Sequence, residues 1–204
     1  MQPEELDGIE PIKPTKTVLV PSGENYIGGE YYFIKAGQED HEGRYIFGEV
    51  ATDEHSLITL GKEDRRRLKI EEILIRRDKL PVFKRSIVNF IVGGCMIRLQ
   101  HPREHFAFAI HTNTQKSAHS CLEDLVIEFL SQIRDRNEET TPIIDELIRE
   151  SYEDIIRSIH EFGFKVAGYE EVQQAVYKAI DEEYINVDIV NCDNDMDALL
   201  DEDT

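Results

Sequence analysis

The spacing of apolar residues changes near Thr114, and this change constrains the fold more than any other feature of the sequence. Before that residue, short runs such as 31–34 and 44–50 alternate in polarity or are apolar on both faces, which is typical of β-strands. After it, apolar residues recur every three or four positions, which is the period of an α-helix. The sequence therefore predicts an α+β chain: an antiparallel β-sheet or partly open small barrel over about 17–112, then a helical part over about 118–185.

The clearest strand prediction is a β-hairpin over 86–100. Gly93 and Gly94 separate two apolar runs there, and a glycine pair favours a two-residue turn because both positions accept a positive φ. Residues 62–80 fit neither period, so helix and strand both remain open for that stretch. Further strands are predicted at 31–34, 44–50, 56–60 and 105–111, where Phe106, Phe108 and Ile110 alternate with other residues.

Three helices are predicted from apolar stripes. The first starts at a capping box beginning with Ser120, the second lies between Thr141–Pro142 and Gly163, and the third runs from about Tyr169 to Tyr184. The stripe of the first consists of Leu122, Leu125, Val126, Phe129, Leu130 and Ile133.

Four parts of the chain follow from these patterns. Residues 1–16 are predicted to be a loose arm, 17–115 a β-rich domain and 116–186 a helical region packed on it. The remaining residues, 187–204, form an acidic tail, because no Lys or Arg occurs after Asp181. Such composition predicts disorder for the tail.

The composition indicates a cytoplasmic protein. The 42 acidic and 23 basic residues give a net charge of −19, which favours solubility and opposes general attraction to anionic membranes. The three cysteines are widely spaced without a CxxC pair, which indicates a reducing compartment. The first residues do not resemble a signal peptide, and the apolar runs are too short to span a bilayer.

The sequence contains no recognised catalytic motif, phosphate-binding loop or metal-ligand pattern, so no cofactor and no metal are predicted. His105 and His111 lie on one face of the predicted strand, but six residues at strand rise separate them by about 20 Å, too far for one ion. Cys95, among apolar residues, is predicted to be core packing.

A basic island in this acidic chain is the first candidate site. Residues 62–103 contain 12 Lys or Arg and 5 Asp or Glu. Guanidinium groups grip phosphate oxygens, so the island could line a groove for nucleic acid or another polyanion; the alternative is a solvated face paired with nearby acids. The candidate side chains are Arg65, Arg66, Arg67, Arg76, Arg77, Lys79, Lys84 and Arg85.

Two main functional hypotheses follow. The first is a non-enzymatic binding or regulatory protein that acts through protein–protein contacts, as an inhibitor, an immunity or antidefence factor, or an assembly factor. Its partner could be basic, and the tail residues Met196, Leu199 and Leu200 would contact it; the stripe of 141–163 is also compatible with a homo-oligomer. The alternative is a single-stranded nucleic-acid-binding accessory protein whose acidic tail competes for the basic groove. An enzyme with an unrecognised site is a third hypothesis.

Overall fold

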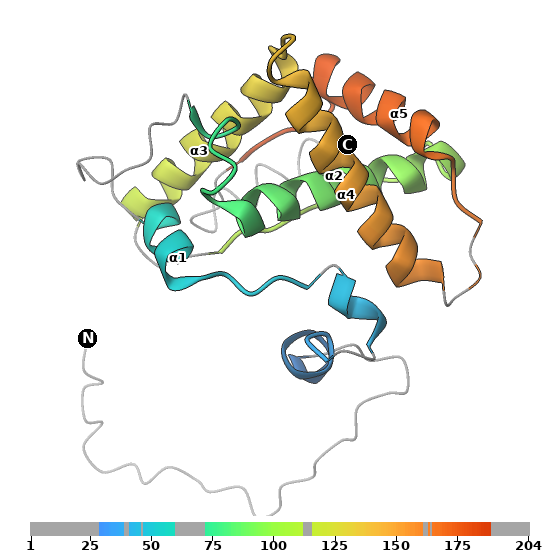
Figure 1. Ribbon diagram of the computed structural model, residues 1–204, viewed down its shortest axis with the longest axis horizontal. Coiled ribbons are helices and arrows are strands. Elements are labelled where there is room, and N and C mark those ends of the chain that lie inside the picture. The colour runs from blue at the N-terminus through green and yellow to red at the C-terminus, as the bar shows by residue number, and fades with distance from the viewer. Residues whose placement is uncertain are drawn as a thin grey trace, which may run out of the picture.

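The computed structural model describes residues 29–38, 41–45, 47–59, 72–111, 116–160, 163 and 165–188. The regular elements in these ranges are all helical (Figure 1). They are a π-helical turn η1 (Tyr31–Lys35), a 3₁₀ turn η2 (Glu42–Tyr45) and the helices α1 (Thr52–Ile58), α2 (Pro81–Gln100), α3 (Lys116–Arg134), α4 (Thr141–His160) and α5 (Tyr169–Asp181). No β-strand occurs in the described ranges, so the predicted α+β fold with a sheet or barrel is wrong.

Helix α2 is the centre of the bundle. Helices α4 and α5 both pack on it, and α5 also contacts α3 and α4 (Figure 1). Pro81 is its first residue, a position where the missing backbone N–H costs no helical hydrogen bond. Its buried residues are Phe83, Lys84, Ile87, Val88, Ile91, Val92, Cys95 and Met96. A helix covered on several sides is apolar around much of its circumference, so its sequence shows no distinct stripe.

The predicted hairpin at 86–100 is wrong because Gly93 and Gly94 lie inside α2. A β-carbon at Gly93 would be 3.7 Å from Ile155 Cδ1, and one at Gly94 would be 3.6 Å from Phe106 Cδ2. The glycine pair therefore lies where α4 and the segment after α2 come close to the helix. Burial of the surrounding apolar residues outweighs the local preference of a glycine pair for a turn.

Helix α1 replaces the strand predicted at 56–60. The Ser56 hydroxyl donates to the carbonyl oxygen of Thr52 at 2.7 Å, and the Thr59 hydroxyl donates to that of His55 at 2.9 Å. Ile58 is the apolar residue of this run that α1 buries in the core. A short β-branched run therefore does not distinguish a strand from a short helix, because either element can bury an apolar residue on one face.

The remaining strand predictions are also wrong. Residues 31–34 lie in η1, and the run 44–50 begins in η2 and continues without regular structure over 47–50. Residues 72–80 form turns rather than a helix or strand, and 105–111 form no ladder with another described segment. Aromatic and β-branched residues suit a pleated surface, but a strand also needs a neighbouring strand to pair with.

The three C-terminal helices are confirmed. All six stripe residues of α3 are buried, although α3 begins at Lys116, before the predicted cap. Ile144 and Ile148, which belong to the predicted stripe of α4, are buried in the core of this chain. Gly163, with φ +68, lies in a turn after α4, and α5 begins at the predicted Tyr169 and ends at Asp181.

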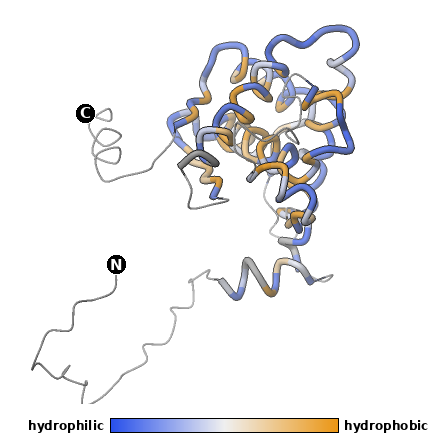
Figure 2. The backbone as a smooth tube through the Cα atoms, turned by 90° about the vertical axis from the view of Figure 1, so that its left-hand side faces the viewer, coloured by the Kyte–Doolittle hydropathy of each residue, from blue (hydrophilic) through white to orange (hydrophobic). Residues whose placement is uncertain are grey.

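Figure 2 shows hydrophobic residues concentrated on the inner sides of the helices and hydrophilic residues on the outside. The core joins residues from all five α-helices and from the turns before α2. None of the described helices combines the length and hydropathy needed to cross a bilayer.

Candidate functional site

Three cations of the basic island contact acidic side chains. Arg76 Nε lies 3.2 Å from Asp78 Oδ1, and Lys79 Nζ lies 3.7 Å from Asp78 Oδ2. Arg77 forms an ion pair of 2.6 Å with Glu146 of α4. The hydrogen bonds from Arg76 and Arg77 lower the pKa of Asp78 and of Glu146, respectively. These cations therefore face carboxylates of the same chain.

Lys84 points inward instead of toward solvent. It is 3 % exposed, and its ammonium group donates to the carbonyl oxygens of Ile73 (3.3 Å) and Arg76 (2.9 Å). Burial lowers the pKa of Lys84 to about 8, partly offset by the charges of Asp78 and Glu54. These hydrogen bonds connect the turns before α2 to the helix. Because the ammonium group is buried, it is not placed to bind a ligand in solution.

Arg85 has a similar structural position. Its guanidinium donates to the backbone oxygen of Tyr45 and lies 2.7 Å from Asp154 Oδ2. Arg157 of α4 lies over the Tyr45 ring, 5.8 Å from its centroid. Arg85 therefore connects η2, α2 and α4.

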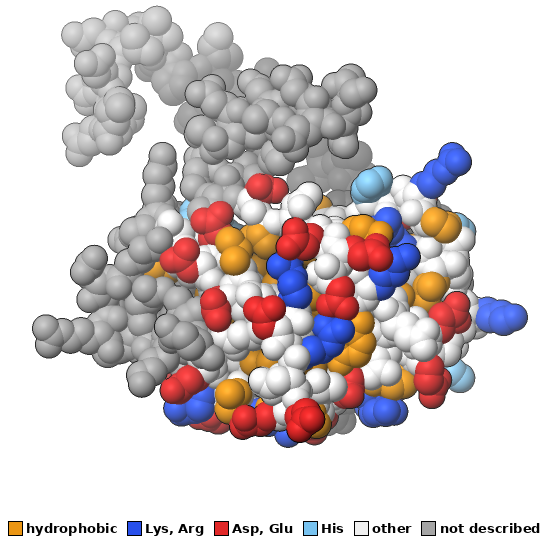
Figure 3. Space-filling model, turned by 90° about the horizontal axis from the view of Figure 1, so that it is seen from above, with side chains coloured by type: hydrophobic (Ala, Val, Ile, Leu, Met, Phe, Trp, Pro, Cys, Tyr) orange, Lys and Arg blue, Asp and Glu red, His pale blue; other side chains and the backbone are white. Residues whose placement is uncertain are grey.

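The five predicted basic residues that the structure describes thus each contact an acidic or carbonyl group of the chain. On the face shown in Figure 3, basic and acidic side chains are interspersed with hydrophobic ones. Arg65, Arg66 and Arg67, and the tail residues Met196, Leu199 and Leu200, lie outside the described residues.

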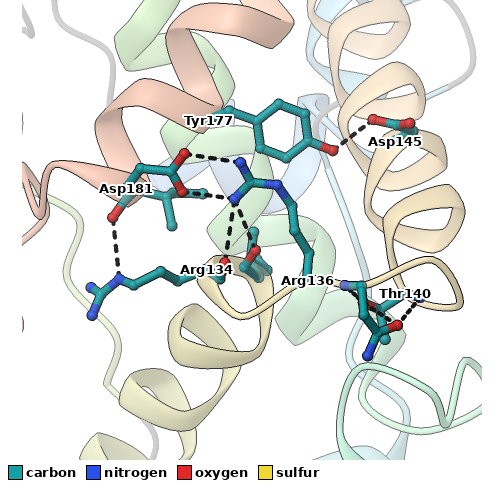
Figure 4. A network of polar contacts seen from close by, with 9 residues as sticks. Arg134, Arg136, Thr140, Asp145, Tyr177 and Asp181 are labelled. Atoms are coloured by element: carbon teal, nitrogen blue, oxygen red, sulfur yellow. Dashed lines mark hydrogen bonds and ion pairs between the residues drawn. The ribbon is translucent and has the colours of Figure 1, made fainter.

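A polar network joins the ends of α3, α4 and α5 (Figure 4). Arg136 donates to both carboxylate oxygens of Asp181, at 2.7 and 2.9 Å, and its guanidinium lies 4.2 Å from the centre of the Tyr177 ring. Tyr177 donates to Asp145 Oδ1 at 2.6 Å. The hydrogen bonds from Arg136 lower the pKa of Asp181, and burial raises the pKa of Tyr177. Every group here has a partner within the chain, so this network is a clamp that holds the helices together.

A groove lies beside the C-terminal half of α2. It encloses about 250 Å³ and is bounded by α2, by residues 104–106 and by residues 179–186. We call it the α2 groove. The residues that line it are Phe90, Ile91, Gly94, Cys95, Arg98, Glu104, His105, Phe106, Ala179, Tyr184, Ile185 and Asn186. The α2 residues recur at helical spacing, which places them on one face of that helix.

The first wall of the α2 groove is the segment 104–111, which runs back along α2 and lines the groove with residues 104–106 (Figure 1). Phe106 lies beside Gly94, and the Phe108 ring stacks on Phe90 with centroids 5.4 Å apart. Ile110 packs against the core. Phe106, Phe108 and Ile110 thus pack on a helix and its core rather than within the predicted sheet. Phe106 and Phe108 remain 39 % and 43 % exposed.

The second wall is the segment 184–188, which follows α5. Tyr184 is 52 % exposed, and the Arg98 guanidinium lies 5.7 Å from its ring centroid. Ile185 and Val187 pack against the core, whereas Asn186 and Asp188 are exposed. Burial therefore alternates along this segment.

Burial explains the chemistry of the cysteine in the groove. Cys95 is buried, as predicted, and burial raises the pKa of its thiol to about 11. At neutral pH it is a protonated, apolar part of the wall. Within the described ranges, no group of three or more His, Cys, Asp or Glu side chains is arranged to hold a metal ion.

Sequence reasoning missed the α2 groove because its walls come from three segments that are distant along the chain. The apolar residues at 106, 108 and 110 are a usable signal, but on their own they indicate a strand of a sheet. Comparison of the chain with protein-family models, with curated proteins and with solved structures yields no match.

Proposed function

We propose that this chain is a non-enzymatic binding protein, and that the α2 groove receives a segment of a partner protein. The supporting observation is the presence of half-exposed aromatic residues at one groove: Phe106 lines it on one side and Tyr184 on the other, and Phe108 stacks on the lining residue Phe90. Aromatic anchors beside a concave apolar surface with a polar rim are characteristic of protein interaction sites.

The chemistry of the groove suits a peptide with both apolar and polar groups. Ile91, Cys95 and Phe106 supply apolar surface, which stabilises a bound apolar side chain by about 25 cal/mol per Å² removed from water. Arg98 and Asn186 supply hydrogen-bond donors at the rim. An apolar floor with a few polar groups at its edge gives affinity and orientation together.

A displayed library of random dodecapeptides, selected on the immobilised full chain, tests this proposal. Selected peptides should bind the Phe106→Ala variant at least ten times more weakly, a loss of about 1.4 kcal/mol. The matched control is Ile127→Ala, which removes an exposed aliphatic side chain on α3, away from the groove. The proposal fails if no peptide is enriched, or if both variants bind the selected peptides as the unmodified chain does.

The alternative of single-stranded nucleic-acid binding now depends on Arg65, Arg66 and Arg67. Of the eight candidate side chains of the basic island, the other five, Arg76, Arg77, Lys79, Lys84 and Arg85, contact acidic or carbonyl groups of the chain. A variant with alanine at all three positions should weaken binding of a labelled oligonucleotide and reduce its salt dependence, as measured by fluorescence anisotropy.

A further inference from the structure

We infer that the partner segment binds as an added β-strand, pairing through its backbone with residues 105–110 and placing alternate side chains in the α2 groove. This inference rests on the proposed function, because it specifies how the same groove is occupied. It names one class of partner: an extended segment of alternating apolar residues.

The contacts of the first wall require an extended backbone. Phe106 lies beside Gly94, and Phe108 stacks on Phe90. A step of two residues along the first wall therefore covers the same distance as a step of four residues along α2. Four helical residues rise about 6 Å, and two residues of a β-strand span about 6.6 Å. The two lengths match, so the segment runs beside α2 in strand-like conformation.

The backbone of this strand-like segment has no hydrogen-bond partner within the described ranges. Residues 105–110 make no backbone hydrogen bond with any part of the chain that the structure describes, and 105–109 are exposed. A strand with free N–H and C=O groups is a template for another strand. A bound helix would satisfy its own backbone and leave these groups unused, whereas a bound strand would pair with them.

The sequence of the segment lacks the features that protect exposed strand edges. Soluble proteins usually place Lys, other charged residues or Pro on such edges, and 105–111 contains no Lys, Arg, Asp, Glu or Pro. Arg103 and Glu104 precede it, so the nearest charges lie at one end. An edge of this kind is suited to being covered by another chain.

The second wall strengthens the inference. Residues 185–188 also alternate, with Ile185 and Val187 turned to the core, and they too make no backbone hydrogen bond with other described residues. Both walls border the same cavity. A strand that pairs with 105–110 on the groove side would therefore insert its alternate side chains between two strand-like segments, with α2 as the floor.

Arg98 specifies a further property of the partner. It lies on the groove and has no ion-pair partner among the residues whose placement is described. Glu104 is the acidic residue of the same lining, and no ion pair joins it to Arg98 within the described ranges. We expect the partner strand to carry a carboxylate near Arg98, because a guanidinium binds a carboxylate through strong charge-assisted hydrogen bonds.

The test uses peptides selected on the full chain and resynthesised with N-methyl groups. Pairing with one edge uses the N–H groups of every second residue, so methylation of alternate residues in one frame should weaken binding at least tenfold. Methylation in the other frame should leave binding nearly unchanged. Amide hydrogen exchange should slow at alternate residues of 105–110 when the unmethylated peptide binds.

Other outcomes separate this inference from the proposed function. If both methylated peptides bind as the parent does, or if the bound peptide is helical by NMR, strand addition is refuted. The proposed function then still stands, provided that Phe106→Ala weakens binding. If exchange at 105–110 slows with rising protein concentration alone, together with a doubled mass in sedimentation, a second copy occupies the edge and a partner peptide is refuted.

Discussion

Replacing Lys84 by methionine should change how the stability of the protein depends on pH. Lys84 is buried, and burial lowers the pKa of its ammonium group from 10.5 to about 8. The unfolded chain therefore holds this proton more tightly than the folded protein does. Stability of the unmodified protein should consequently rise as the pH increases from about 8 to about 10.5, since deprotonation removes the buried charge.

The magnitude follows from the size of the pKa shift. A lowering from 10.5 to about 8 is worth about 3 kcal/mol, at 1.36 kcal/mol for each pKa unit. The Lys84→Met variant has no titrating group at this position, so it lacks this gain. It also loses the hydrogen bonds to the carbonyl oxygens of Ile73 and Arg76, but that loss is the same at every pH.

Urea unfolding at several pH values between 7 and 10.5 would measure the effect. The free energy of unfolding of Lys84→Met, minus that of the unmodified protein, should fall by about 3 kcal/mol across this range. Groups that titrate in both proteins cancel in the difference. Lys178→Met, which removes an exposed lysine of α5, is the control. Parallel stability curves for Lys84→Met and the unmodified protein would refute the reasoning.

Three further outcomes are expected. Phe129→Ala should lower the free energy of unfolding by about 3–5 kcal/mol, because Phe129 is fully buried, whereas the exposed Ile127→Ala should change it by less than about 0.5 kcal/mol in the same urea titration. Arg136→Ala should lower the free energy of unfolding by about 1 kcal/mol at pH 7, because it removes the paired hydrogen bonds to Asp181. Arg136 lowers the pKa of Asp181, so this loss should shrink as the carboxylate is protonated below about pH 4. The same loss at pH 2 as at pH 7 would contradict this reasoning. Cys95, with its pKa raised to about 11, should resist alkylation at pH 8 and be modified only in urea, as read by mass spectrometry of its peptide.

Sequence patterns predicted the helices that have one buried face and misassigned the helix that has several. Helices α3, α4 and α5 each alternate an apolar stripe with charged residues, because one side meets the core and the other meets water. Helix α2 is covered on several sides, so residues 87–92 and 95–99 read as two apolar runs on either side of Gly93 and Gly94. Strand and buried helix share that pattern, and only the tertiary packing distinguishes them.

The candidate site was predictable only in part. The alternation of Phe106, Phe108 and Ile110 correctly identified residues with a common apolar face, but the sequence does not show that α2 lies beneath them. The charges of the basic island were visible, whereas their ion pairs with Glu146 and Asp154 depend on α4, which lies far along the chain. Long-range partners decide whether a charge is available for a ligand, and local sequence does not specify them.

The central position of α2 has a consequence for protein synthesis. Its packing partners α4 and α5 end at His160 and Asp181, so the ribosome must add 81 residues after Gln100 before α5 is complete. At typical synthesis rates of 5–20 residues per second, this takes roughly 4–16 seconds. During that interval α2 lacks at least one of the two helices that pack on its apolar surface. Nascent chains of this protein should therefore depend on ribosome-associated chaperones more than a protein whose core closes between neighbouring helices.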